Sequence, residues 1–150
     1  MKKIMIVDDN YLSAEGIEKN IDWETLNAEI IHVCYNGTSA IEAMKKEPAD
    51  LIISDIEMPD LDGISMSRQA LEINPMVKII LISAYDKFEY ARRALLLGAL
   101  DYIEKPLDYA YLIQKVKNAF ALMEKEQKNL QLLKQSRPLL TEKFFREITH

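Results

Sequence analysis

The 150-residue sequence has a single cysteine, Cys34, so it cannot form an internal disulfide bond. This favours a reducing compartment, and a lone thiol in an apolar stretch is most simply a buried, inert side chain. Basic residues are also in deficit, because 19 lysines and arginines face 24 aspartates and glutamates and the net charge is −5. The chain therefore lacks the positive footprint that nucleic-acid binding requires, and any contact with DNA would need another domain.

Long apolar runs are missing as well. The chain begins with two lysines and apolar residues, as a signal peptide does, but Asp8 and Asp9 end that run after four residues. No other run approaches the roughly 20 residues that cross a bilayer. We therefore expect a soluble, cytoplasmic protein with no membrane partner. Its length suits one domain with a short appendage, and 49% hydrophobic residues are enough to build a core.

Short apolar runs rich in β-branched residues recur along the chain and alternate with segments of helical spacing. Strands that alternate with helices predict βαβ units, and hence an α/β fold whose parallel sheet is covered on both faces. Five such repeats predict a (βα)5 domain of about 120 residues. The predicted strands are residues 3–7, 29–35, 51–54, 78–83 and 101–104.

The sequence after Asp108 predicts a fifth, extended helix. Its apolar spacing continues weakly through Leu130 and Leu133, and we expect Pro138 to end it. The charged later part is typical of a solvated linker helix or, alternatively, of one half of a coiled coil. Residues 139–148 begin a fresh amphipathic pattern, either a small docking helix or the start of a missing domain. We thus predict one domain in residues 1–125 and a linker with the start of a following segment in residues 126–150.

Polar side chains follow the predicted strands at the edge where parallel sheets bind their ligands. Three carboxylates, a hydroxyl and an ammonium should converge there. Asp8 and Asp9 follow the first strand, Asp55 the third, Ser83 ends the fourth, and the fifth leads to Lys105. An ordinary ion-pair network, with Ser83 as a helix cap, is the simpler alternative.

Three neighbouring carboxylates repel one another unless a cation lies among them. A hard divalent ion with few protein oxygens favours Mg²⁺ over Ca²⁺, and Zn²⁺ is disfavoured because no histidine or cysteine occupies these strand ends. A metal, a hydroxyl and a lysine together indicate phosphoryl transfer. Ser83 could accept the phosphoryl group, but no histidine base accompanies it, whereas Asp55 is already ionised. Asp55, central in the sheet, is the better candidate.

Four segments, IVDDN (6–10), DIEMPDLDG (55–63), LISAYD (81–86) and DYIEKPLD (101–108), resemble the signature regions of bacterial response-regulator receiver domains. The resemblance covers residues 1 to about 125. It implies a flavodoxin-like, doubly wound sheet of strand order 2-1-3-4-5. It also implies that Asp55 accepts a phosphoryl group from a partner sensor histidine kinase.

The same resemblance assigns the metal ligands. It implies that Asp9 and Asp55 bind Mg²⁺ directly together with the backbone carbonyl of Glu57, while Asp8 acts through water. Pro59 and Gly63 then have structural roles in the loop that follows Asp55.

The same resemblance implies that residues at the ends of the fourth and fifth strands bind the phosphoryl group and act as the switch. Ser83, Ala84 and Lys105 would bind the phosphoryl group, and the Lys105–Pro106 bond is expected to be cis. Tyr102 resembles the family's switch aromatic, although a half-buried strand tyrosine is the simpler reading. The output surface would comprise the fourth helix, fifth strand and fifth helix. Such a protein is a signalling switch and not an enzyme, and we expect a homodimer linked to phosphorylation.

A narrower resemblance, carried by residues 21–26, 35–43 and 83–106, is to receivers of the YesN-like subfamily. Members usually continue into an AraC-type DNA-binding domain, so DNA contact would come only through a C-terminal domain absent here. A stand-alone receiver that acts by protein contact is the alternative. A haloacid-dehalogenase-type phosphatase would need a D-x-D-x-[TV] motif after the first strand, and IVDDNYL does not match it. A flavin or nucleotide binder would find its phosphate repelled by Asp8 and Asp9.

Overall fold

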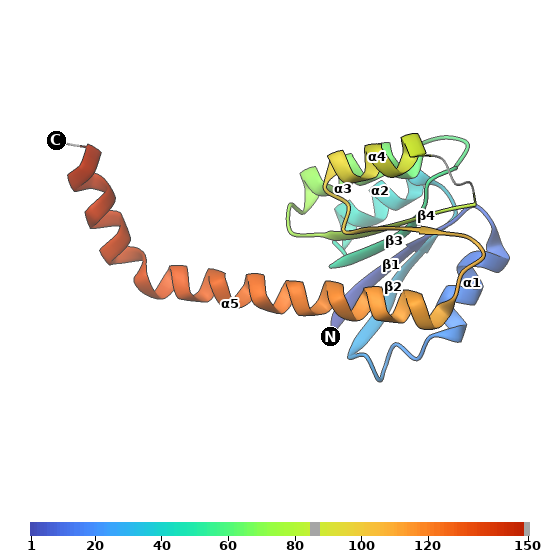
Figure 1. The fold of residues 1–150 in the computed structure, drawn as a ribbon, viewed down its shortest axis with the longest axis horizontal. Coiled ribbons are helices and arrows are strands. Elements are labelled where there is room, and N and C mark those ends of the chain that lie inside the picture. The colour runs from blue at the N-terminus through green and yellow to red at the C-terminus, as the bar shows by residue number, and fades with distance from the viewer. Residues whose placement is uncertain (85–87, 149–150) are drawn as a thin grey trace. The chain divides into compact units, whose positions relative to one another are not determined.

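The computed structural model describes residues 1–84 and 88–148 (Figure 1). Contacts divide the chain into two compact units, Met1–Lys117 and Asn118–His150. Strands and helices alternate strictly along the described chain. The elements are β1 (Lys2–Val7), α1 (Tyr11–Asn20), β2 (Ala28–Cys34), α2 (Gly37–Lys46), β3 (Leu51–Asp55), α3 (Gly63–Ile73), β4 (Lys78–Ser83), α4 (Phe88–Leu97), β5 (Asp101–Glu104) and α5 (Tyr109–Ile148).

The five strands form one sheet in the order β2-β1-β3-β4-β5, with every neighbouring pair parallel. This confirms the predicted α/β class, the doubly wound topology and the strand order, and each strand begins within one residue of its predicted start. Because β1 and β3 lie at the centre of the sheet, the residues that follow them meet at the middle of its carboxyl edge.

The unbroken apolar runs of the central strands reflect burial on both faces of the sheet. Figure 1 shows α2, α3 and α4 over one face and α1 with the first turns of α5 over the other. Met5 and Val7 of β1 pack in the core cluster under α2 and α3, whereas the intervening Ile4 and Ile6 are buried outside that cluster. Alternate residues thus serve two cores, which is why these strands do not alternate between apolar and polar.

Three helices begin at a side chain that caps them from a loop at the carboxyl edge. Asn10 accepts a hydrogen bond from the N–H of Ser13, and Asp62 accepts one from the N–H of Ser65. Asn36 caps α2 in the same way. Each such cap is worth about 1 kcal/mol, so the loops that carry the site are anchored where the helices start.

The α5 helix runs without interruption from Tyr109 to Ile148, so the prediction that Pro138 ends it is wrong. A proline inside a helix removes one backbone hydrogen bond and crowds the carbonyl four residues earlier, and a bend of the helix relieves the crowding. Figure 1 shows the ribbon of α5 bending toward its C-terminal end. Residues 139–148 are therefore the last part of this helix and not a separate one. Among all described residues, no helix has the length and apolar character to cross a membrane.

Candidate functional site

The carboxyl ends of β1, β3 and β4 place three polar side chains in the interior of the protein. Asp8 follows β1, Asp55 ends β3 and Ser83 ends β4, with exposed fractions of 1%, 7% and 0%. Burial of carboxylates is costly unless they are paired or hydrogen-bonded. Their partners therefore decide what the site can do.

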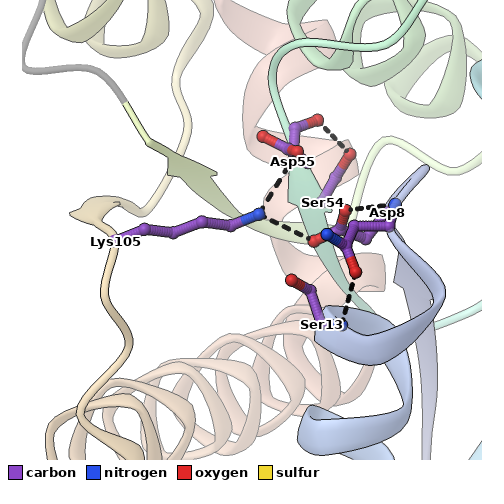
Figure 2. A network of polar contacts seen from close by, with 6 residues as sticks. Asp8, Ser13, Ser54, Asp55 and Lys105 are labelled. Atoms are coloured by element: carbon purple, nitrogen blue, oxygen red, sulfur yellow. Dashed lines mark hydrogen bonds and ion pairs between the residues drawn. The ribbon is translucent and has the colours of Figure 1, made fainter.

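Lys105 pairs with both buried carboxylates. Its Nζ lies 3.1 Å from Oδ2 of Asp8 and 3.4 Å from Oδ2 of Asp55. Figure 2 shows the lysine side chain extending from beyond β5 toward the two carboxylates. The backbone N–H of Lys105 donates to the carbonyl of Ser83 at 2.8 Å, so the lysine is held beside the end of β4. The structure thus brings four polar residues together, as their places at or after the ends of the predicted strands had indicated: Asp8, Asp55, Ser83 and Lys105.

Asp9 completes a cluster of three carboxylates. Asp8, Asp9 and Asp55 each offer one oxygen, and these oxygens all lie within 4.8 Å of one another. Asp9 is exposed, and Asp8 is oriented by the N–H of Asn10, 2.9 Å from its Oδ1. Lys105 balances only one of the three negative charges. The donor set is therefore all oxygen with an excess of negative charge, which suits a hard divalent cation.

The titration of the site follows from its burial. Burial raises the pKa of Asp55 to about 6 and the charge of Asp8 acts in the same direction, against the charge of Lys105 and a hydrogen bond from the backbone of Glu57. Burial lowers the pKa of Lys105, but the charges of Asp55 and Asp8 outweigh it, so the net pKa is raised. At neutral pH Asp55 is thus ionised and Lys105 is protonated.

The backbone under Asp55 is held from several sides. Ser54 donates its hydroxyl to the Asp55 carbonyl at 2.8 Å (Figure 2), and the N–H of Gly63 donates to the carbonyl of Ile56 at 2.8 Å. A Cβ at Gly63 would collide with the Asp55 carbonyl oxygen. The absence of a side chain at Gly63 therefore lets α3 begin directly against the strand that carries Asp55.

Sequence reasoning missed Asp60, which connects this loop to α2. Its carboxylate accepts hydrogen bonds from the backbone N–H of Gly37 at 3.3 Å and of Thr38 at 3.2 Å. Hydrogen bonding from Thr38 is the main reason that the pKa of Asp60 is lowered to about 2. Because 22 residues separate Asp60 from Thr38, no local pattern could have revealed the contact.

The other predicted residues lie around this centre. Glu57 is half-buried and Pro59 exposed in the loop after β3, and Ala84 is exposed beyond β4. Tyr102 is half-buried and packs against the core cluster. The Lys105–Pro106 bond is cis, as expected. The last two residues of the motif at 81–86 lie outside the described residues.

The fold and the site define a doubly wound α/β protein with a buried, lysine-paired aspartate in an acidic cluster at the carboxyl edge of its sheet. The sequence pattern of the response regulator receiver domain matches residues 4–117. The chain belongs to the response regulator receiver domain family.

Several known proteins resemble the chain. The uncharacterized transcriptional regulatory protein YesN of Bacillus subtilis (strain 168) is 29% identical over 126 residues, which are 84% of this chain and 34% of YesN. The transcriptional regulatory protein HptR of Staphylococcus aureus (strain NCTC 8325 / PS 47) is 30% identical over 112 residues, 75% of this chain and 44% of HptR. The chain thus spans less than half the length of these curated relatives.

Solved structures agree with these relatives. The receiver domain of AraT, a response regulator from Geobacillus stearothermophilus, superposes with a TM-score of 0.79 at 34% identity, covering 84% of this chain and 98% of that one. A two-component transcriptional regulator AraC from Clostridium phytofermentans superposes with a TM-score of 0.75 at 30% identity, covering 86% and 99%.

Proposed function

We propose that this chain is the phosphoacceptor part of a two-component response regulator and that Asp55 accepts a phosphoryl group from the phosphohistidine of a sensor histidine kinase. The observation that carries the proposal is the buried Asp55 carboxylate, which Lys105 and two further carboxylates surround at the centre of the sheet edge. Membership of the receiver family supports it.

The residues at the site suit such a transfer. An oxygen of Asp55 would bond to phosphorus while the phosphorus–nitrogen bond breaks, and the leaving imidazole keeps the electron pair and takes up a proton. Asp55 is ionised for this step because its pKa of about 6 lies below neutral pH. Lys105, already 3.4 Å from Asp55, is placed to bind a phosphoryl oxygen. With Ser83 and Ala84 it would hold the transferred group.

Asp8, Asp9 and Asp55, with the carbonyl of Glu57, are the residues that would hold Mg²⁺. When bound, Mg²⁺ would neutralise negative charge on the phosphoryl oxygens. The fit rests on the three carboxylate oxygens within 4.8 Å of one another and on a single lysine to balance them. Asp8 and Asp9 thus serve to position the cation beside the acceptor.

The phosphoryl group adds negative charge and strong acceptors at a point where Ser83 and Lys105 can be drawn in. Half-buried Tyr102 lies on β5, three residues before Lys105, and packs against the core cluster, so a change in its packing would alter the surface of α4, β5 and α5. We propose that this surface supports a phosphorylation-linked homodimer. In this proposal residues 1–125 form the receiver and residues 126–150 form a linker. The linker would connect the receiver to a DNA-binding domain through which the protein controls transcription. The transcriptional regulators among its relatives support this role. We propose that the protein acts in the cytoplasm.

Phosphoryl transfer can be tested with a small donor. Incubation with acetyl phosphate and Mg²⁺ should add one phosphoryl group, measured as a mass increase, and EDTA should prevent it. The Asp55→Asn variant should gain no mass, because an amide does not attack phosphorus. An Asp60→Asn variant, which also removes one loop carboxylate, is the matched control and should still be labelled. Equal labelling of Asp55→Asn and wild type would refute the assignment.

A further inference from the structure

The two loops that carry the proposed metal ligands line an open depression. Asp9 belongs to the loop between β1 and α1, and Asp55 leads into the loop between β3 and α3. A depression of about 440 Å³ adjoins the acidic cluster, and its lining consists of Asp9 from the first loop and of residues 56–59 and Asp62 from the second. Side chains of the two loops thus border this space without filling it. The separation of the loops must be set elsewhere in the structure.

A pair of tyrosine rings joins the start of α1 to the loop before α2. Tyr11 begins α1, two residues after Asp9, and Tyr35 directly follows β2. Their ring centroids lie 4.1 Å apart, with an interplanar angle of 37°. In the same two segments, the backbone N–H of Asp8 donates to the carbonyl of Cys34 at 3.0 Å. Figure 1 shows α1 and α2 on opposite faces of the sheet, so the ring pair connects the starts of two helices that share no face.

The loop before α2 is also fixed to the loop between β3 and α3. As described above, Asp60 accepts hydrogen bonds from the backbone N–H groups of Gly37 and Thr38. A Cβ at Gly37 would collide with the carbonyl oxygen of Leu61, so the two backbones are in close contact. Residues 35–38 therefore contact both the start of α1 and the β3–α3 loop, although none of them carries a proposed ligand.

We propose that Tyr11 and Tyr35 are positioning residues, which hold Asp9 at the distance from the β3–α3 loop that Mg²⁺ requires. The inference rests on the proposed function, because it concerns the metal ligands named there. Mg²⁺ demands nearly ideal octahedral geometry with ligands at about 2.1 Å, so small displacements of Asp9 matter. Without the ring pair, the loop spends less time in the binding arrangement, and the apparent dissociation constant rises as that fraction falls.

The test is a double-mutant cycle on the affinity of the full chain for Mg²⁺. The dissociation constant is measured from amide NMR shifts during a Mg²⁺ titration, and the fluorescence of buried Trp23 verifies that each variant is folded. Tyr11→Ala and Tyr35→Ala should each raise the dissociation constant by roughly fivefold, as expected for the loss of one aromatic pair. The double variant should raise it no further, because either substitution alone removes the contact.

Two further variants separate the ring contact from other effects of substitution. Tyr35→Phe keeps the ring and should keep the wild-type dissociation constant. Leu12→Ala is the matched control, since Leu12 lies next to Tyr11 in the first turn of α1 and is 79% exposed, and it should also leave the constant unchanged. Labelling with acetyl phosphate should be slower in the alanine variants of the two tyrosines at limiting Mg²⁺, and saturating Mg²⁺ should restore the wild-type rate.

The possible failures of the inference and of the proposed function are distinct. Single alanine variants with the wild-type dissociation constant would overturn the inference. A double variant whose effect is the product of the two single effects, or a Tyr35→Phe variant that loses affinity, would overturn it equally. If wild-type Asp55 is not labelled at saturating Mg²⁺, the proposed function fails, whereas the titrations still decide whether the ring pair positions Asp9.

Discussion

Replacing Asp55 with asparagine should stabilise the metal-free protein, although it removes the proposed acceptor. The folded state raises the pKa of Asp55 from 3.8 to about 6, so folding disfavours its charged form. A raised carboxyl pKa costs stability above the folded pKa, and this cost disappears as the pH falls toward the unfolded value. Each pKa unit is worth about 1.4 kcal/mol, so the cost at pH 8 is about 3 kcal/mol. A neutral amide of the same shape avoids it.

The assay is urea unfolding in EDTA, followed by the fluorescence of Trp23. This residue is the single tryptophan of the chain and is 6% exposed, so unfolding changes its surroundings. The free energy of unfolding of Asp55→Asn should exceed that of wild type by about 3 kcal/mol at pH 8 and by about half of that at pH 5. Saturating Mg²⁺ should reduce this difference in the free energy of unfolding, because it stabilises the carboxylate cluster of the wild-type protein.

Replacing Asp60 with asparagine is a control that should change the free energy of unfolding in the opposite direction. The pKa of Asp60 is lowered to about 2, so its charged form favours folding above pH 4 and this contribution is lost as the pH falls toward 2. Asp60→Asn should therefore destabilise the protein at pH 8. An Asp55→Asn variant no more stable than wild type in EDTA at pH 8 would refute the burial argument.

Two further predictions concern backbone packing and the long helix. Gly63→Ala should lower the free energy of unfolding by about 1–3 kcal/mol and slow labelling of Asp55, because its Cβ meets the Asp55 carbonyl. Gly98→Ala, with φ +92° and open space around it, should cost about 1 kcal/mol in unfolding experiments and leave labelling unchanged. Deleting residues 126–150 should reduce any self-association measured by analytical ultracentrifugation, since Leu130 and Leu133 are 46% and 54% exposed on α5. If deleting residues 126–150 leaves the oligomeric state measured by ultracentrifugation unchanged, the helix is better described as a solvated linker.

Much of the fold could be predicted because its signals are local. Apolar runs short enough for strands, separated by segments of helical spacing, admit few arrangements besides a parallel α/β sheet. The end of α5 could not be predicted in this way. Proline disfavours a helix interior, yet α5 continues through Pro138, since a bend relieves the crowding that a straight helix could not.

The candidate site was predictable to the extent that topology alone places it. Asp8, Asp55 and Ser83 each stand at the end of a strand, and parallel strands bring such ends to one edge whatever the details of packing. Their partners were not predictable. Asp60 reaches α2 across the sheet edge, and Gly63 meets the carbonyl of Asp55, through contacts between segments that are separate in the sequence.

The sequence by itself determined the order of the elements, the residues that end each strand and the chemistry that those residues can perform. These follow from hydrophobic periodicity and side-chain type, which need no knowledge of neighbours in space. Only the tertiary structure decided that Lys105 lies between Asp8 and Asp55 and that burial raises the pKa of the acceptor. The ion pairs of Lys105 depend on distances in space, and the raised pKa of Asp55 depends on its burial. Both come about only when the chain folds and packs together residues as far as 97 positions apart in the sequence.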